Sequence, residues 1–125
     1  MESTDLFLRF VERYVDKDRK PRWRELASKP LAVFKKLTQL EAQIDERWPR
    51  VEPAAAADLL TALVSRHQPV WCWNFGTSAP DRLASAADAS TVNPRRAFLA
   101  MSEDGGDALF FNGDMTCWIC GSWKP

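Results

Sequence analysis

The stretch of sequence that decides the fold is Asp107-Ala108-Leu109-Phe110-Phe111-Asn112-Gly113-Asp114-Met115-Thr116-Cys117-Trp118-Ile119. In it, Asn112-Gly113 separates two apolar runs. Asn-Gly is the strongest short-range signal for a β-hairpin, because both residues tolerate positive φ. A two-residue loop at this point would place Phe111 opposite Asp114. The sequence therefore predicts an antiparallel hairpin over these residues.

Both faces of this predicted hairpin are apolar. Directly opposed residues share a face, so this register puts Phe110 with Cys117 on one face and Phe111 with Trp118 on the other. A sheet with one face in water would alternate apolar and polar residues, and this one does not. The face with Phe111 and Trp118 needs a cover. Either segment 76–95 or the chain ends cover it, or a partner protein or a second copy of the chain does.

Two further strands are predicted upstream of the hairpin. Residues 70–75 are aromatic and β-branched, as strands are, and 97–101 form the second apolar run before a glycine-containing turn at 102–106. With the hairpin, they give a sheet of about four strands. Residues 76–95 are small, polar and proline-containing, which predicts a loop with a candidate short helix at 81–89.

The first half of the chain has helical periodicity. Apolar residues recur three and four apart, which predicts helices over about 5–15, 21–27, 31–46 and 53–67. Prolines stand at the expected first turns of the last three, where a missing N–H costs little. The 125 residues are a common size for one domain. The sequence thus predicts a single α+β domain over 1–125, with a helical half (3–68) packed on an antiparallel strand half (70–120).

Composition limits the class of protein. The chain is 46% hydrophobic and 27% charged, which is typical of globular proteins. It shows no signal peptide and no apolar run long enough to cross a membrane, and its three cysteines argue against a disulfide framework. These features predict a cytoplasmic protein without a membrane segment. Alanine runs such as 54–57 are typical of a bacterial, GC-rich genome.

No motif identifies a reaction, a cofactor or a metal. Cys117 and Cys120 form a C-x-x-C, but within a strand they would lie roughly 10 Å apart and point to opposite faces, which favours core cysteines. Cys120, beside Gly121, could still leave the strand and react. His67, the single histidine, is predicted at an exposed helix end. The sequence therefore predicts a non-enzyme, and a small enzyme would require His67, a cysteine and an acid in one pocket.

Charge is unevenly distributed. Residues 17–36 hold eight basic and two acidic side chains in a chain of zero formal net charge, so the remainder is net negative by six. Such asymmetry steers a partner. Basic residues around an aromatic such as Trp23 also grip nucleic acid in some proteins, so a nucleic-acid-binding or regulatory protein that uses 17–36 is the alternative to a protein-binding module.

A helical first half, followed by tryptophan-containing strands and the hairpin at 107–114, resembles the small α+β immunity proteins that neutralise bacterial polymorphic toxins. The resemblance implies a protein that binds its cognate toxin and occludes the active site. It rests on no single motif and transfers no functional residues. From residue type and charge, the expected partner contacts are Arg22, Trp23, Arg24, Glu103, Asp104, Phe111 and Trp118.

Overall fold

The computed structural model describes residues 3–29, 39–40, 43–45, 47–52, 56–67, 69–74, 80–93, 96–113 and 116–123. They contain a six-stranded antiparallel sheet with the order β1-β6-β5-β4-β2-β3. The predicted α+β class is confirmed, although the sheet has six strands and not about four. The strands are β1 (Arg50–Val51), β2 (Val70–Asn74), β3 (Asp81–Leu83), β4 (Phe98–Ser102), β5 (Asp107–Phe111) and β6 (Cys117–Gly121).

Helices form where the sequence periodicity predicts them. The predicted helices at 5–15, 21–27 and 53–67 are confirmed within the described residues, whereas most of the predicted helix at 31–46 lies outside them. Segment 81–89, expected as loop or short helix, holds both the edge strand β3 and a short helix. The described helices are α1 (Ser3–Tyr14), the 3-10 turn η1 (Lys17–Arg19), α2 (Lys20–Ala27), α4 (Ala56–Arg66) and α5 (Ala86–Ala89).

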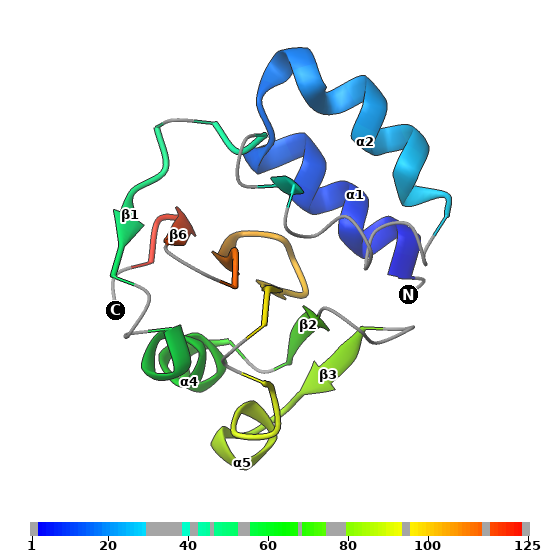
Figure 1. The fold of residues 1–125 in the computed structure, drawn as a ribbon. Coiled ribbons are helices and arrows are strands. Elements are labelled where there is room, and N and C mark those ends of the chain that lie inside the picture. Colours follow the sequence, from blue (N-terminus) through cyan, green and yellow to red (C-terminus); the bar gives the residue numbers. More distant parts are fainter. Residues whose placement is uncertain are drawn as a thin grey trace.

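Helices pack on both faces of the sheet. In Figure 1, α1 and α2 lie on one side of the strands, and α4 and α5 lie on the other. Every residue of β4 and β5 is buried, as expected for strands that are covered on both faces. One core joins α1 and α2 to side chains such as Leu99, Phe110 and Trp118. The second core joins α4 and α5 to side chains such as Leu109 and Phe111.

The hairpin has a wider loop than Asn112-Gly113 predicts. Phe111 pairs with Cys117 and not with Asp114, so the register is displaced by three residues. The Asn112 N–H donates to the carbonyl of Thr116 over 3.2 Å, and the Thr116 N–H donates to the Asn112 side chain over 3.1 Å. An odd displacement moves a strand's side chains to the other face. Phe110 therefore lies opposite Trp118, in the core beneath α1 and α2.

Of the alternative covers predicted for the hairpin, the structure shows cover by the chain itself. Phe111 is 4% exposed and Trp118 is 3% exposed. The Phe111 ring packs 5.7 Å from that of Phe98, and the Trp118 ring packs 5.3 Å from that of Phe110. The two helical layers cover one ring each. Neither a partner nor a second copy of the chain is needed to bury the hairpin.

Candidate functional site

Three of the predicted partner contacts are core residues. Trp23, like Phe111 and Trp118, is buried, and its ring centroid lies 6.1 Å from that of Phe7. These three side chains are not available at the surface. A tryptophan on an amphipathic helix can pack in the core as readily as in an interface. Residue type alone therefore could not show that Trp23 is buried.

The two predicted arginines of α2 are exposed. Arg24 forms an ion pair with Glu12 of α1, with Nε 2.5 Å from Oε1, and this contact lowers the pKa of Glu12. Arg22 lies on the exposed side of the same helix. Both belong to the basic stretch 17–36, and neither lines the groove described below.

Glu103 and Asp104 hold the β4–β5 turn in place. The Glu103 carboxylate accepts a hydrogen bond from the Trp71 indole N–H over 3.0 Å, and its carbonyl accepts one from Arg9 of α1. Asp104 Oδ1 accepts from the Gly106 N–H over 2.8 Å, and this bond is the main reason why the pKa of Asp104 is lowered. Their contacts tie the turn to α1 and β2 and do not join it to α2.

The cysteines are core residues, as the strand geometry predicts. Cys117 and Cys120 lie in the two different cores, so their side chains point to opposite faces. All three cysteines, Cys72 included, are free and buried. Burial raises the pKa of Cys117 to about 12 and raises the pKa of Cys120 as well. The expectation that Cys120 leaves the strand is wrong.

His67 makes a contact that the sequence did not reveal. Its Nε2 lies 2.5 Å from Oδ2 of Asp107. The other carboxylate oxygen accepts the N–H of Ser122 over 3.0 Å and that of Trp123 over 3.2 Å. The side chains of His67 and Asp107 are 28% and 9% exposed. Among the described residues, no thiol or hydroxyl group contacts this imidazole, so no nucleophile is paired with it. The His67–Asp107 contact instead links the end of the sheet to α4.

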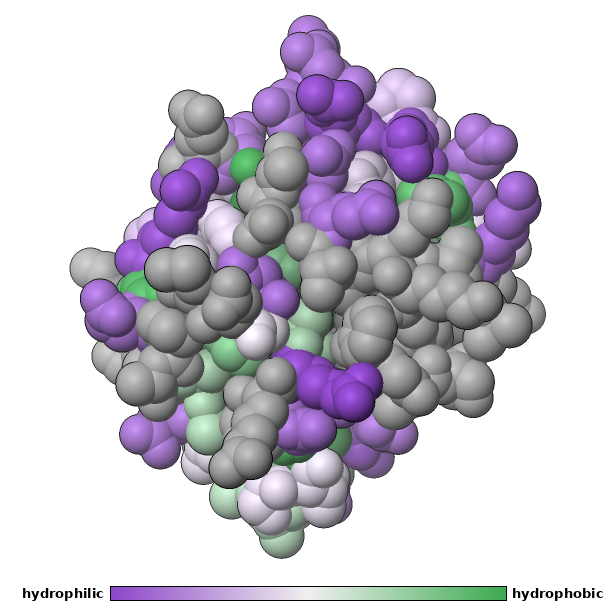
Figure 2. Space-filling view, viewed as in Figure 1, coloured by the Kyte–Doolittle hydropathy of each residue, from purple (hydrophilic) through white to green (hydrophobic). Residues whose placement is uncertain are grey.

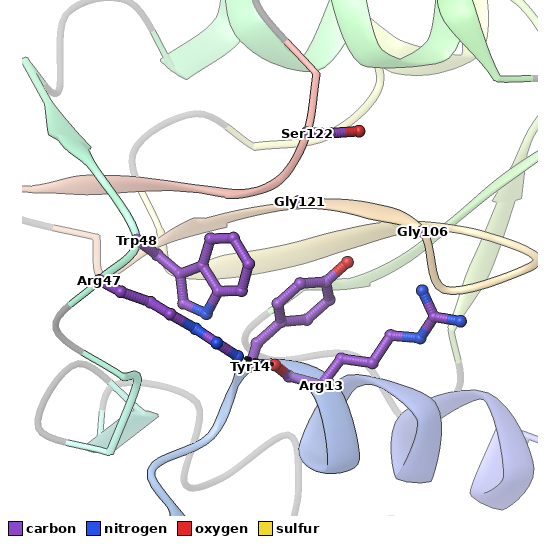
Figure 3. A pocket seen from close by; sticks show the side chains of 7 residues that line it. All are labelled: Arg13, Tyr14, Arg47, Trp48, Gly106, Gly121 and Ser122. Carbon is purple, nitrogen blue, oxygen red and sulfur yellow. Dashed lines mark hydrogen bonds between the residues drawn. The ribbon is translucent and has the colours of Figure 1, made fainter.

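A hollow lined by arginine and aromatic side chains lies at the end of α1. It is a broadly open groove of about 390 Å³, formed by α1, the segment before β1, and the adjoining ends of β5 and β6 (Figure 3). Its volume is in the range of small-ligand sites. The lining residues are Arg13, Tyr14, Arg47, Trp48, Gly106, Gly121 and Ser122.

Packing fixes the aromatic wall of the groove. The Tyr14 hydroxyl donates to the carbonyl of Gly105 over 2.6 Å. The Trp48 ring meets that of Tyr14 edge-on at 5.2 Å, and Figure 3 shows the two rings side by side. Burial raises the pKa of Tyr14 above its ordinary value, so the hydroxyl stays neutral at physiological pH. The wall is a rigid, uncharged aromatic surface.

Arginine side chains supply the charge of the groove. The Arg47 guanidinium lies 4.7 Å from the centroid of the Trp48 ring, and its Nη2 donates to the carbonyl of Arg13 over 3.4 Å. Its ion pair with Asp45 is loose, with Nε 3.8 Å from Oδ2 and both side chains exposed, so it contributes little. In Figure 3 the Arg13 side chain extends towards Gly106.

Hydrophilic side chains also surround this region. Figure 2 shows them crowded over the end of the molecule that carries α1 and α2. Paler, weakly hydrophobic residues gather at the opposite end, where α5 lies.

The fold and the groove define an α+β domain with helices on both faces of an antiparallel sheet and an arginine- and tryptophan-lined hollow at one end. Comparison with protein-family models, curated proteins and solved structures finds no match. Among the described residues, no three His, Cys, Asp or Glu side chains lie together as metal ligands do. No described helix has the length and apolarity to span a membrane.

Proposed function

We propose that this chain is a protein-binding module whose partner contacts the groove at the end of α1. The observation that carries the proposal is the Arg47–Trp48 pair, in which a guanidinium lies 4.7 Å from the centroid of a partly exposed tryptophan. Arginine and tryptophan are the residue types that dominate binding energy in protein interfaces.

The structure favours this surface because its arginines are already positioned. Arg50 on β1 makes a related contact, with its guanidinium 5.6 Å from the centroid of the buried Trp118 ring. A side chain that rests on an aromatic face loses less rotational freedom on binding than a free one, so more of the contact energy remains as affinity. The surface is therefore better prepared for a partner than the exposed Arg22.

The class of partner comes from the resemblance to immunity proteins. In that case the partner is a bacterial toxin, and the module blocks it by occluding its active site. The basic stretch that includes α2 contributes through the rate of encounter, since charges outside an interface mainly change association rates and salt dependence. A cytoplasmic location remains a prediction from the sequence.

Affinity capture from a native lysate tests the proposal. The bait is the wild-type chain, and the test variant is Arg47→Glu. The matched control is Arg82→Glu, an exposed arginine on β3, at the opposite edge of the sheet from β1. We expect wild type and R82E to retain the same protein and R47E to lose it.

Three results would contradict the proposal. Equal retention by R47E and R82E would remove the groove from the contact. Recovery of nucleic acid alone, with a steep loss of binding as salt rises, would favour the nucleic-acid alternative. Recovery of only a second copy of the chain would favour a homodimer. If the retained protein is a toxin, inhibition of its activity by the wild-type chain tests the immunity role directly.

A further inference from the structure

We infer that the groove receives a short acidic segment of the partner, with carboxylates bound by Arg13 and Arg47 across a floor of bare glycine backbone. The inference rests on the proposed function and names the chemistry of recognition. Its volume of about 390 Å³ lies within the range of small-ligand sites. The groove therefore selects a few side chains of the partner.

Two glycines, Gly106 and Gly121, line the floor of the groove. Gly121 has φ +101°, and a Cβ at this position would lie 2.5 Å from Oδ1 of Asp107. The paired strand end therefore excludes a side chain at Gly121. At Gly106 a Cβ would meet the Asp104 carboxylate at 3.2 Å, which is also tight. At both positions the place of a Cβ is taken by the protein's own atoms, so backbone and not side chain lines the groove here.

The two arginines reach the groove from different elements. Arg13 is on the last turn of α1, and Arg47 comes from the segment before β1. Both are exposed. A guanidinium binds a carboxylate through two parallel hydrogen bonds. This two-bond contact is stronger than the loose contact between Arg47 and Asp45. An incoming carboxylate can therefore replace Asp45 as the partner of Arg47.

The surrounding charges favour a peptide over a nucleic acid. Asp45 lies beside Arg47, and the Asp104 carboxylate is close enough to Arg13 for the arginine to help lower its pKa, after the larger effects of Gly106 and Ser102. With these acids nearby, the groove offers two cationic positions and not the run of cations that a phosphate backbone requires. A peptide can place one carboxylate at each arginine and an uncharged group against Trp48 between them.

Peptide titration followed by amide NMR tests the inference. The probe is hexaglutamate, with hexaglutamine as the uncharged control and a six-residue oligo-dT as a different polyanion. We expect hexaglutamate to shift the amide signals of Gly106 and Gly121, and hexaglutamine to leave them in place. Arg13→Gln and Arg47→Gln should each weaken the binding about fivefold to tenfold, whereas Arg82→Gln should not change it.

Each other result overturns the inference. Absence of shifts with hexaglutamate, or equal affinity in R13Q, R47Q and R82Q, would do so. Tighter binding of oligo-dT at the same glycines would assign the groove to nucleic acid. The proposed function fails separately, because it depends on whether R47E loses a captured protein. If capture of the protein depends on Arg47 but hexaglutamate does not bind the groove, the proposal of a protein-binding module stands. The inference of an acidic segment is then rejected.

Discussion

Replacement of Asp107 by alanine should destabilise the domain more than any surface substitution. The carboxylate is 9% exposed and accepts three hydrogen bonds, from His67 and from the N–H groups of Ser122 and Trp123. Alanine removes all three acceptor contacts at once. The Trp123 N–H is then left in a residue that is 3% exposed, where water cannot replace the lost acceptor.

The magnitude follows from these contacts. A hydrogen bond to a charged group contributes about 1.5–3 kcal/mol, and a buried donor that is left without an acceptor costs about 1–3 kcal/mol. Ser122 is exposed, so water can hydrate its N–H and reduce the cost. We expect Asp107→Ala to lose about 3–4 kcal/mol. His67→Ala should lose about 1–2 kcal/mol, because the carboxylate keeps its two backbone donors.

Urea unfolding followed by far-UV circular dichroism measures both values. In a thermal scan, a loss of this size corresponds to a fall in Tm of about 10–15 °C for a domain of this length. Asp107→Asn is the matched control, because its amide oxygen can still accept one backbone N–H, and it should lose roughly half as much. The double variant with His67→Ala gives the coupling energy. A cost below about 1 kcal/mol for Asp107→Ala, or a coupling below about 0.5 kcal/mol, would refute the reasoning.

Three further predictions concern the core and the strand ends. The buried Trp23 indole N–H has no acceptor, whereas that of Trp123 donates to a carbonyl over 3.0 Å, so Trp23→Phe should cost about 1 kcal/mol less than Trp123→Phe in urea unfolding. Gly121→Ala should cost at least about 2 kcal/mol, because of its φ of +101° and the contact with Asp107; an unchanged urea midpoint would contradict this. Burial raises the pKa of Cys117 from 9.0 to about 12. The stability from this thiol is therefore present below pH 9 and lost as pH rises, by about 1.4 kcal/mol per pH unit up to the folded pKa. Urea midpoints between pH 8.5 and 10.5 should fall less steeply in Cys117→Ala.

Local patterns were sufficient to predict most elements of the fold. Helix α1 follows from apolar residues at helical spacing, and strand β5 has the bounds that the sequence predicts. The edge strands β1 and β3 have two and three residues. Strands so short show no alternation, and they form only because a longer neighbour offers its edge. Their existence is a tertiary effect that no sequence window contains.

The register of the hairpin could not be predicted because both faces are apolar. Alternation of polar and apolar residues normally fixes register, since a wrong register exposes the apolar set. Here both faces of the hairpin are buried. A displacement of the second strand moves its apolar side chains from one buried face to the other, so both registers bury similar side chains. The Asn112 side chain, which closes the wider loop through Thr116, distinguishes the two. The Asn-Gly pattern identified the turn but not its length.

The candidate site could not be predicted from the sequence, because its residues come from distant segments of the chain. The groove combines Arg13, Arg47 and Gly121, and a side-chain contact joins His67 to Asp107, which are 40 residues apart. Arg47 and Trp48 directly follow the helix predicted at 31–46, and Asp107 begins the predicted hairpin. No spacing rule relates such positions, so only the sheet order brings them together.

The apolar hairpin shows how an observation can be sound and its functional interpretation wrong. Phe111 and Trp118 were correctly recognised as needing a cover, but all the predicted helices were assigned to one layer. An amphipathic helix covers one face of a sheet, and a connection such as that from α2 to α4 can pass around the sheet edge and place later helices on the other face. A sheet with two apolar faces is therefore expected to have helices packed on both faces. Evidence for a partner has to come from side chains that remain exposed after both layers are in place, and those are the arginines of the groove and not the aromatic residues of the strands.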